Sequence, residues 1–355
     1  MAEAVSIDGN LLARALAGSW RTEPPEWELS ARELSAVARV LAVSGAGALA
    51  WRSVSRTVWR ATAAAQDLRQ AYLLQTLKAA VREAEIARLF ALLDSAGVDA
   101  VLVKGWAASG VYAEPGLRPC GDIDLCVRPR HYSRAKDVLA SEEGRAFWVD
   151  LHAGFERLHD GNVEELFERS RVARVCGARV RVLSEEDHLR LLCLHLLRHG
   201  AWRPLWLCDV AAALEARGAA FDWGLLLGRN GRRAEWVTCT LGLAHVLLGA
   251  RVSGTPAAEA AARLPRWLVS GVLRRWGGTR APAQPPYTHR APIASYLREP
   301  RRLLRDLRDR WPGPVEATVC VGGRFGRMPR WPFQLANCFT RAACFVAGAR
   351  RPVAW

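Results

Sequence analysis

Three aspartates in the middle of the chain have the type and spacing of a site for divalent cations. Asp122 and Asp124 are two residues apart in DIDLCVRP (122–129), where polar and apolar residues alternate as in a strand. Residues i and i+2 of a strand point to the same face, about 6–7 Å apart, and carboxylates this close repel each other unless a cation lies between them. Asp150 lies at a similar point of a later candidate strand, two residues before His152. These oxygen ligands predict a site for Mg²⁺ or Mn²⁺.

Short strands and helices would have to position these acids. DAVLVKG (99–105) is an apolar run that ends in glycine, which is typical of a buried strand entering a tight turn. At such a turn, Gly105 allows the backbone to approach a phosphate closely. For the acids at 122 and 124 taken alone, an exposed edge strand with solvated side chains is the alternative. The same patterns predict short helices over 106–112 and 131–143, and strands over 122–129, 147–155 and 178–183.

Longer helices flank this part of the chain. Ser30 and Glu33 have the spacing of a capping box, and Ser184 is the expected N-cap of a later helix. The apolar positions between 73 and 81 share one helix face. A proline-rich stretch, APAQPP (281–286), predicts a linker or an extended arm. Helical spacing of apolar residues is found over 29–43, 57–95, 183–199, 205–218 and 236–249.

The order of these motifs resembles a known superfamily. VLVKGWAAS, then Tyr112, then PGLRPCGDIDLCV is similar to the nucleotidyltransferase superfamily that includes DNA polymerase β, and more narrowly to an uncharacterised bacterial nucleotidyltransferase family. The resemblance covers residues 60–220 and implies an α/β fold with a small mixed-sheet nucleotidyltransferase core, flanked by N-terminal and C-terminal helical regions. The expected parts are an N-terminal helical region (1–97), the core (98–183), a helical region packing on the core (184–262) and an arginine-rich C-terminal segment (263–355).

The resemblance also implies a reaction. Asp122 and Asp124 match the metal-binding pair, and Asp150 matches the third carboxylate, which in active members helps the attacking hydroxyl to lose its proton. The implied activity is the Mg²⁺- or Mn²⁺-dependent transfer of a nucleoside monophosphate from a nucleoside triphosphate (NTP) to an acceptor hydroxyl, with release of pyrophosphate. The acceptor stays open between a small molecule, a peptide, a protein and an RNA end.

The resemblance further implies that other residues of these motifs bind the nucleotide. Gly105 stands at the turn beneath the phosphates, and Lys104 and Arg118 match basic positions that would contact phosphate. His195 and His199 lie at i and i+4 of one predicted helix face and would line the nucleotide cleft. From the residues alone, these two histidines have two other interpretations: packing within an apolar helix, or ligation of a metal ion.

The net charge of +15 is concentrated near the C-terminus. Residues 263–355 carry 18 arginines against 4 acids, a surplus of 14, whereas residues 1–262 are nearly neutral. Arginines interleaved with tryptophans fit an anionic partner, either a lipid surface contacted by an amphipathic helix or nucleic acid. The alternative is a solvated arginine-rich face, because arginine replaces lysine throughout this chain, with 47 arginines against three lysines.

Composition argues against several other classes of protein. No apolar run reaches the roughly 18–20 residues of a transmembrane segment, and the N-terminus lacks the pattern of a secretory signal. Nine cysteines without a C-x-x-C pair predict small core residues in a reducing compartment, so we expect a cytoplasmic protein. Two rival functions remain: a catalytically degenerate binding protein that kept the nucleotidyltransferase fold, and a toxin-like nucleotidyltransferase acting on RNA.

Overall fold

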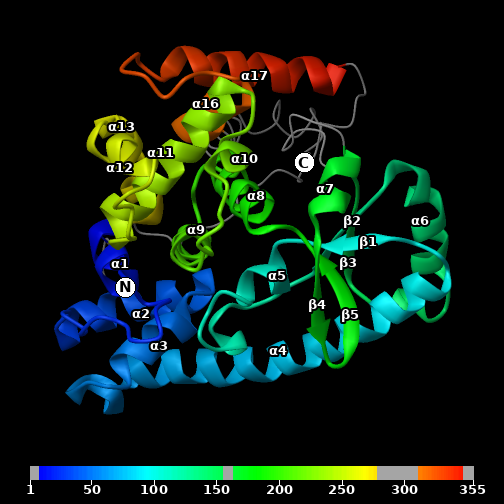
Figure 1. Cartoon of the computed structure of the whole chain (residues 1–355). Helices are drawn as coiled ribbons and strands as arrows, with labels where there is room; N and C mark the ends of the chain where they lie inside the picture. The colour runs from blue at the N-terminus through cyan, green and yellow to red at the C-terminus, as the bar shows by residue number, and fades with distance from the viewer. Residues whose placement is uncertain (1–7, 155–162, 278–310, 347–355) are drawn as a thin grey trace, which may run out of the picture.

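The protein contains a five-stranded sheet with helices on both of its faces (Figure 1). The computed structural model describes residues 8–154, 163–277 and 311–346. The proline-rich stretch 281–286 lies outside the described residues, so its prediction as a linker stays a prediction. None of the helices in the described ranges is long and apolar enough to cross a membrane. The nine cysteines are free thiols, and Cys126, Cys193 and Cys208 are buried.

The N-terminal part consists of four α-helices. The predicted capping box is present, because the Ser30 hydroxyl accepts a hydrogen bond from the Glu33 N–H and the Glu33 carboxylate accepts one from the Ser30 N–H. The helices are α1 (Gly9–Leu16), α2 (Ala31–Ser44), α3 (Gly47–Val54) and α4 (Ala63–Ser95), with a 3₁₀ turn, η1 (Val58–Ala61), before the last.

Helix α4 is 33 residues long and supports both the other N-terminal helices and the sheet. Leu68 is buried among the N-terminal helices, and Ile86 and Leu89 are buried against the sheet. The apolar residues between 73 and 81 do share a face, but Leu73, Leu74, Leu77 and Val81 are exposed on it. The local periodicity therefore predicted correctly that this helix has an apolar face, but it did not predict whether other elements cover that face.

The sheet has the strand order β3-β2-β1-β5-β4 and is mixed. Strand β1 is antiparallel to β2 and parallel to β5, whereas β2 and β3 run parallel to each other and β4 is antiparallel to β5. The predicted α/β class with a small mixed sheet is confirmed. The strands are β1 (Ala100–Leu102), β2 (Ile123–Val127), β3 (Val149–Ala153), β4 (Arg171–Val175) and β5 (Ala178–Val182), and β4 was not predicted from the sequence.

The two faces of the sheet pack against different sets of helices. One face, which includes Leu102 and Leu125, contacts α4 and the short helix α6 (Tyr132–Ala140). The other face, which includes Val101 and Cys126, belongs to the larger core formed by the remaining helices. Because side chains alternate along a strand, Asp124 shares its face with Cys126 and therefore lies between the sheet and the helical region.

The helical region begins directly after β5. Ser184 caps α8 by accepting a hydrogen bond from the Asp187 N–H, as predicted, and α9 follows after a short turn. The helices of the second half are α7 (Val163–Arg169), α8 (Glu185–Arg198), α9 (Pro204–Glu215), α10 (Trp223–Leu227), α11 (Gly231–Leu248), α12 (Ala257–Ala262), α13 (Arg266–Trp276), α16 (Pro314–Cys320) and α17 (Trp331–Val346). A short helix, α5 (Gly105–Ser109), leaves β1 on the same side of the sheet.

The described part of the C-terminal segment packs on the body of the protein. Trp276 of α13 is fully buried, and its indole N–H donates to the Ala201 carbonyl at 2.7 Å. Val315 of α16 belongs to the same core, and α16 packs on both α8 and α17. The boundary at residue 262 marks a change of charge, while the hydrophobic core continues across it.

We expect Trp276→Ala to lower the free energy of unfolding by about 3–5 kcal/mol, because it leaves a large cavity and an unpaired Ala201 carbonyl. Trp331→Ala is the control, since Trp331 lies in the same segment and is exposed. Urea unfolding followed by circular dichroism measures both. Equal stability of the two variants would show that α13 is not part of the core.

Candidate active site

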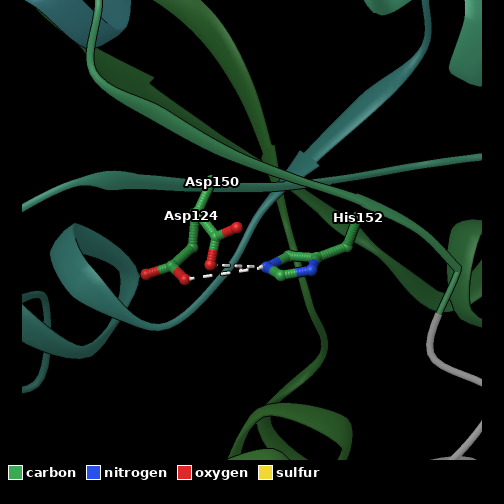
Figure 2. Close-up of side chains that lie close together, drawn as sticks. All are labelled: Asp124, Asp150 and His152. Carbon is green, nitrogen blue, oxygen red and sulfur yellow. Dashed lines mark ion pairs between the residues drawn. The ribbon is translucent and has the colours of Figure 1, made fainter. Parts of the chain in front are cut away.

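The register of two parallel strands brings two acids together. Asp124 of β2 lies directly opposite Asp150 of β3, and His152 follows two residues later on the same face of β3. Figure 2 shows the three side chains converging. The imidazole Nε2 of His152 is 3.1 Å from Asp150 Oδ2 and 3.9 Å from Asp124 Oδ1. Strands β2 and β3 therefore supply three polar side chains to one point on the sheet.

Lys104 adds a positive charge to this cluster. It is buried where β1 turns into α5, and its ammonium group forms an ion pair with Asp124 Oδ1. Its backbone has φ 50° and ψ −132°, a conformation that residues other than glycine rarely adopt and that costs on the order of 1–3 kcal/mol. The surrounding structure holds this strained turn, which keeps the ammonium group on the acids.

The local charges shift the pKa values of the neighbouring groups. Asp122, directly before β2, has a raised pKa because of burial and, next, the charge of Asp124. A hydrogen bond from His152 lowers the pKa of Asp150. Burial alone would lower the pKa of His152, but its hydrogen bonds to Asp124 and Asp150 raise it overall. The site therefore concentrates negative charge that nearby cations stabilise.

The donor set fits a divalent cation. One ligand atom each from Asp124, Asp150 and His152 lies within 4.8 Å of the other two, close enough for one ion to be shared. The two carboxylates suit Mg²⁺ or Mn²⁺, whereas the imidazole, which binds a metal only when it is neutral, favours a transition metal. Asp122 lies two residues before Asp124 in the sequence but is not part of this group. The sequence predicted the acids at 122, 124 and 150, and the structure joins Asp124 and Asp150.

His152 was missed as a site residue. Its signal was present in the sequence, because residues i and i+2 of a strand share a face and Asp150 was already a candidate. Gly105 lies across from these acids with a positive φ of 21°, and a side chain there would contact the Asp122 carbonyl and Asp124 Oδ2 at 3.6 and 3.7 Å. Glycine therefore leaves open the space over Asp124.

The structure places Arg118 in a buried ion pair. Its Nη2 is 3.0 Å from Asp209 Oδ2 of α9, and its Nε is 3.3 Å from both carboxylate oxygens. The Tyr112 hydroxyl donates to Asp209 Oδ1 at 2.7 Å. This pair ties the loop before Asp122 to α9, so the guanidinium that was expected to contact phosphate is already bound by a carboxylate.

His195 and His199 lie in an aromatic cluster on α8 and α9. The His195 ring is 4.4 Å from that of Trp206 and 4.5 Å from that of His199. Burial lowers the pKa of His199 to about 4 and that of His195 well below its usual value, so both are neutral at pH 7. Their rings pack on each other and on Trp206, and neither belongs to the group around Asp124.

Comparison with known proteins identifies the family of the chain. Residues 30–249, more than half of the chain, match the family described as uncharacterised nucleotidyltransferases. The chain belongs to this family. No curated protein matches the sequence. Among solved structures, an antigenic nucleotidyltransferase-like protein from Paracoccidioides brasiliensis is similar at 13% identity and a TM-score of 0.33, over 48% of this chain and 92% of that chain.

The range matched to the nucleotidyltransferase family includes every candidate site residue from Lys104 to His199. It begins at the N-cap of α2 and ends just after α11, so it also includes the long helix α4. Helices α13, α16 and α17 lie beyond the match. The family match therefore covers the sheet and its adjoining helices and ends before the arginine-rich segment.

We expect Asp209→Ala to destabilise the protein by about 3–5 kcal/mol, because it leaves the buried Arg118 guanidinium without its carboxylate. Tyr112→Phe is the matched control, since it removes one hydrogen bond to the same carboxylate, worth about 1 kcal/mol. Urea unfolding at pH 7 measures both changes. A loss below 1 kcal/mol for Asp209→Ala would contradict the structural role of the pair.

Because His188 of α8 is buried, we expect the protein to lose stability in acid. Burial lowers the pKa of His188 from its ordinary 6.5 to about 4, so the unfolded chain binds a proton that the folded state refuses. The stabilisation is complete above pH 6.5 and is lost as the pH falls toward 4, by on the order of 3 kcal/mol. Thermal unfolding measured from about pH 7.5 to about pH 4.5 should show a smaller decline in stability for His188→Leu than for the wild type. Parallel curves for the two proteins would contradict the assignment.

Proposed function

We propose that this protein transfers a nucleoside monophosphate from an NTP to an acceptor hydroxyl, with Mg²⁺ or Mn²⁺ as the metal. One observation supports this most: Asp124 and Asp150 face each other across parallel strands in a chain that belongs to a nucleotidyltransferase family. Paired carboxylates in this arrangement are what metal-assisted phosphoryl-type transfer needs. The proposed bond forms between the acceptor oxygen and the α-phosphorus, and the bond to pyrophosphate breaks.

The acids have different exposures and therefore different proposed roles. The Asp124 carboxylate is almost fully buried, so it is the fixed ligand of the metal. His152 contacts the carboxylates of Asp124 and Asp150 and orients both. The Asp150 side chain is about half exposed, so an acceptor hydroxyl can reach it and give it a proton. Asp122 adds negative charge next to both. When bound, a divalent cation neutralises phosphate charge and favours the ionised form of the hydroxyl.

Lys104 has a proposed role on the phosphate side. Its ammonium group lies against Asp124 and is held there by a strained turn, next to the glycine that leaves the space over Asp124 open. An ammonium at this place balances the acids before a nucleotide binds and contacts a phosphate oxygen afterwards. Arg118 contributes indirectly, because its pairing with Asp209 fixes the loop that leads to Asp122.

A second candidate function is nucleotide binding without catalysis. The contact that favours it is the ion pair between Lys104 and Asp124, because an ammonium group already balances one carboxylate there. A protein of this kind would bind an NTP in the absence of a divalent cation and would release no pyrophosphate. A toxin-like enzyme that modifies RNA differs from the first proposal only in its acceptor.

The decisive experiment is incubation of the protein with each α-labelled NTP, Mg²⁺ or Mn²⁺, and cell extract. We expect one labelled product with the wild type and none after addition of EDTA. Asp124→Asn and Asp150→Asn should each reduce the rate by about 100-fold or more, because a metal ligand contributes several kcal/mol to such a reaction. The control is Asp137→Asn, an exposed acid of α6 that should leave the rate unchanged.

The outcomes separate the candidates. Transfer that survives in both active-site variants would contradict the proposed site. NTP binding in EDTA without any transfer, reduced in Lys104→Gln, would support the binding protein. Labelling of an RNA species that RNase removes from the extract would identify RNA as the acceptor.

A further inference from the structure

Helix α17 presents an apolar stripe to solvent. Trp331, Leu335 and Phe339 are spaced at i, i+4 and i+8, and their exposed fractions are 60%, 37% and 72%. Met328, 63% exposed, extends the stripe in the loop before the helix. In Figure 1, α17 lies along the outer edge of the protein, far from the sheet. Such a row of large apolar side chains on one helix face usually marks an interaction surface.

The opposite face of α17 fixes how the helix is oriented. Asn337 is buried, Gln334 donates to the Pro312 carbonyl at 2.7 Å, and Arg341 pairs with the buried Glu316 of α16 at 3.2 Å. These polar contacts hold α17 on α16 from one side. The stripe is therefore exposed by a defined packing arrangement, and the helix cannot bury it by rotating without breaking those contacts.

Charge around the stripe is positive. Within the described residues 263–277 and 311–346, Glu316 is the one acid, and it is buried and paired with Arg341. Arg327 is exposed beside Met328, and the Arg324 side chain is 77% exposed although it lies 3.8 Å from Glu235. In the sequence, the whole segment 263–355 to which α17 belongs has 18 arginines against 4 acids.

We infer that α17 docks in the plane of an anionic lipid surface. A helix with an apolar face that includes tryptophan, bordered by arginine, inserts that face at the boundary of headgroups and acyl chains while the arginines pair with lipid phosphates. Nucleic acid fits the stripe less well, because the aliphatic side chains of Leu335 and Met328 offer no ring on which a base can stack. This inference is independent of the proposed function, since no candidate active-site residue lies on α17.

Flotation of the full-length protein with vesicles tests the inference. We expect binding to vesicles of equimolar phosphatidylcholine and phosphatidylglycerol, no binding to pure phosphatidylcholine, and weaker binding as salt increases. Leu335→Asp/Phe339→Asp should weaken binding at least tenfold. Leu77→Asp is the matched control, because Leu77 is 65% exposed in the other apolar stripe, on α4, and should bind like the wild type.

A second measurement locates the contact without depending on lost binding. Brominated phosphatidylglycerol should quench tryptophan fluorescence of the wild type, and the quenched fraction should fall in Trp331→Phe although this variant still floats. Arg324→Gln/Arg327→Gln should weaken binding about tenfold or more while thermal stability stays the same.

Several outcomes would overturn the inference. These are equal flotation of Leu335→Asp/Phe339→Asp and the wild type, equal binding to neutral vesicles, or quenching that Trp331→Phe does not change. Binding to RNA without binding to vesicles would assign the surface to nucleic acid instead. Self-association that Phe339→Asp abolishes, with no flotation, would assign it to a second copy of the chain.

Discussion

Repulsion between neighbouring carboxylates is the constraint around which the candidate site is organised. The parallel register of β2 and β3 places Asp124 beside Asp150, and burial, followed by the charge of Asp124, raises the pKa of Asp122. Folding into this register is tolerable because Lys104 and His152 supply counter-charge and hydrogen bonds. Lys104 does so from a strained backbone conformation at the turn between β1 and α5.

The remaining architecture holds that register in place. The sheet lies between two hydrophobic cores, one with α4 and α6 and one with the helical region, so its strands cannot shift without exposing one of them. Two polar contacts fix the loop that leads to Asp122. Arg82 of α4 donates to the Gly121 carbonyl, and Arg118 is clamped by Asp209 of α9. Acids, loop and both helical layers thus form one connected unit.

The C-terminal segment combines two properties that its composition alone does not separate. Trp276 and Val315 are buried in the same core as α8 and α9, so part of the segment stabilises the body. Helix α17 lies farther out (Figure 1) and exposes Trp331 and Phe339, and the loop before it exposes Arg324 and Arg327. A charge count describes the segment as uniformly basic, whereas its packing divides it into a structural part and an exposed part.

Much of the local structure was determined by the sequence itself. The capping box of Ser30 and Glu33, the N-cap at Ser184 and the strands carrying Asp124 and Asp150 all follow from residues a few positions apart. The mixed α/β class was implied by the resemblance that the motif order carries. The motif order also led to the nucleotidyltransferase family, which the match over residues 30–249 confirms.

Only the tertiary structure decided which side chains meet. The pairing of Asp124 with Asp150, the contacts of Lys104 and His152 with Asp124, and the ion pair of Arg118 with Asp209 join residues that are distant in sequence. The apolar stripe of α4 between 73 and 81 is exposed for a related reason, because periodicity shows that a helix has an apolar face but not what packs on it. Strand register and helix packing depend on long-range contacts, and a local pattern contains no information about the partner.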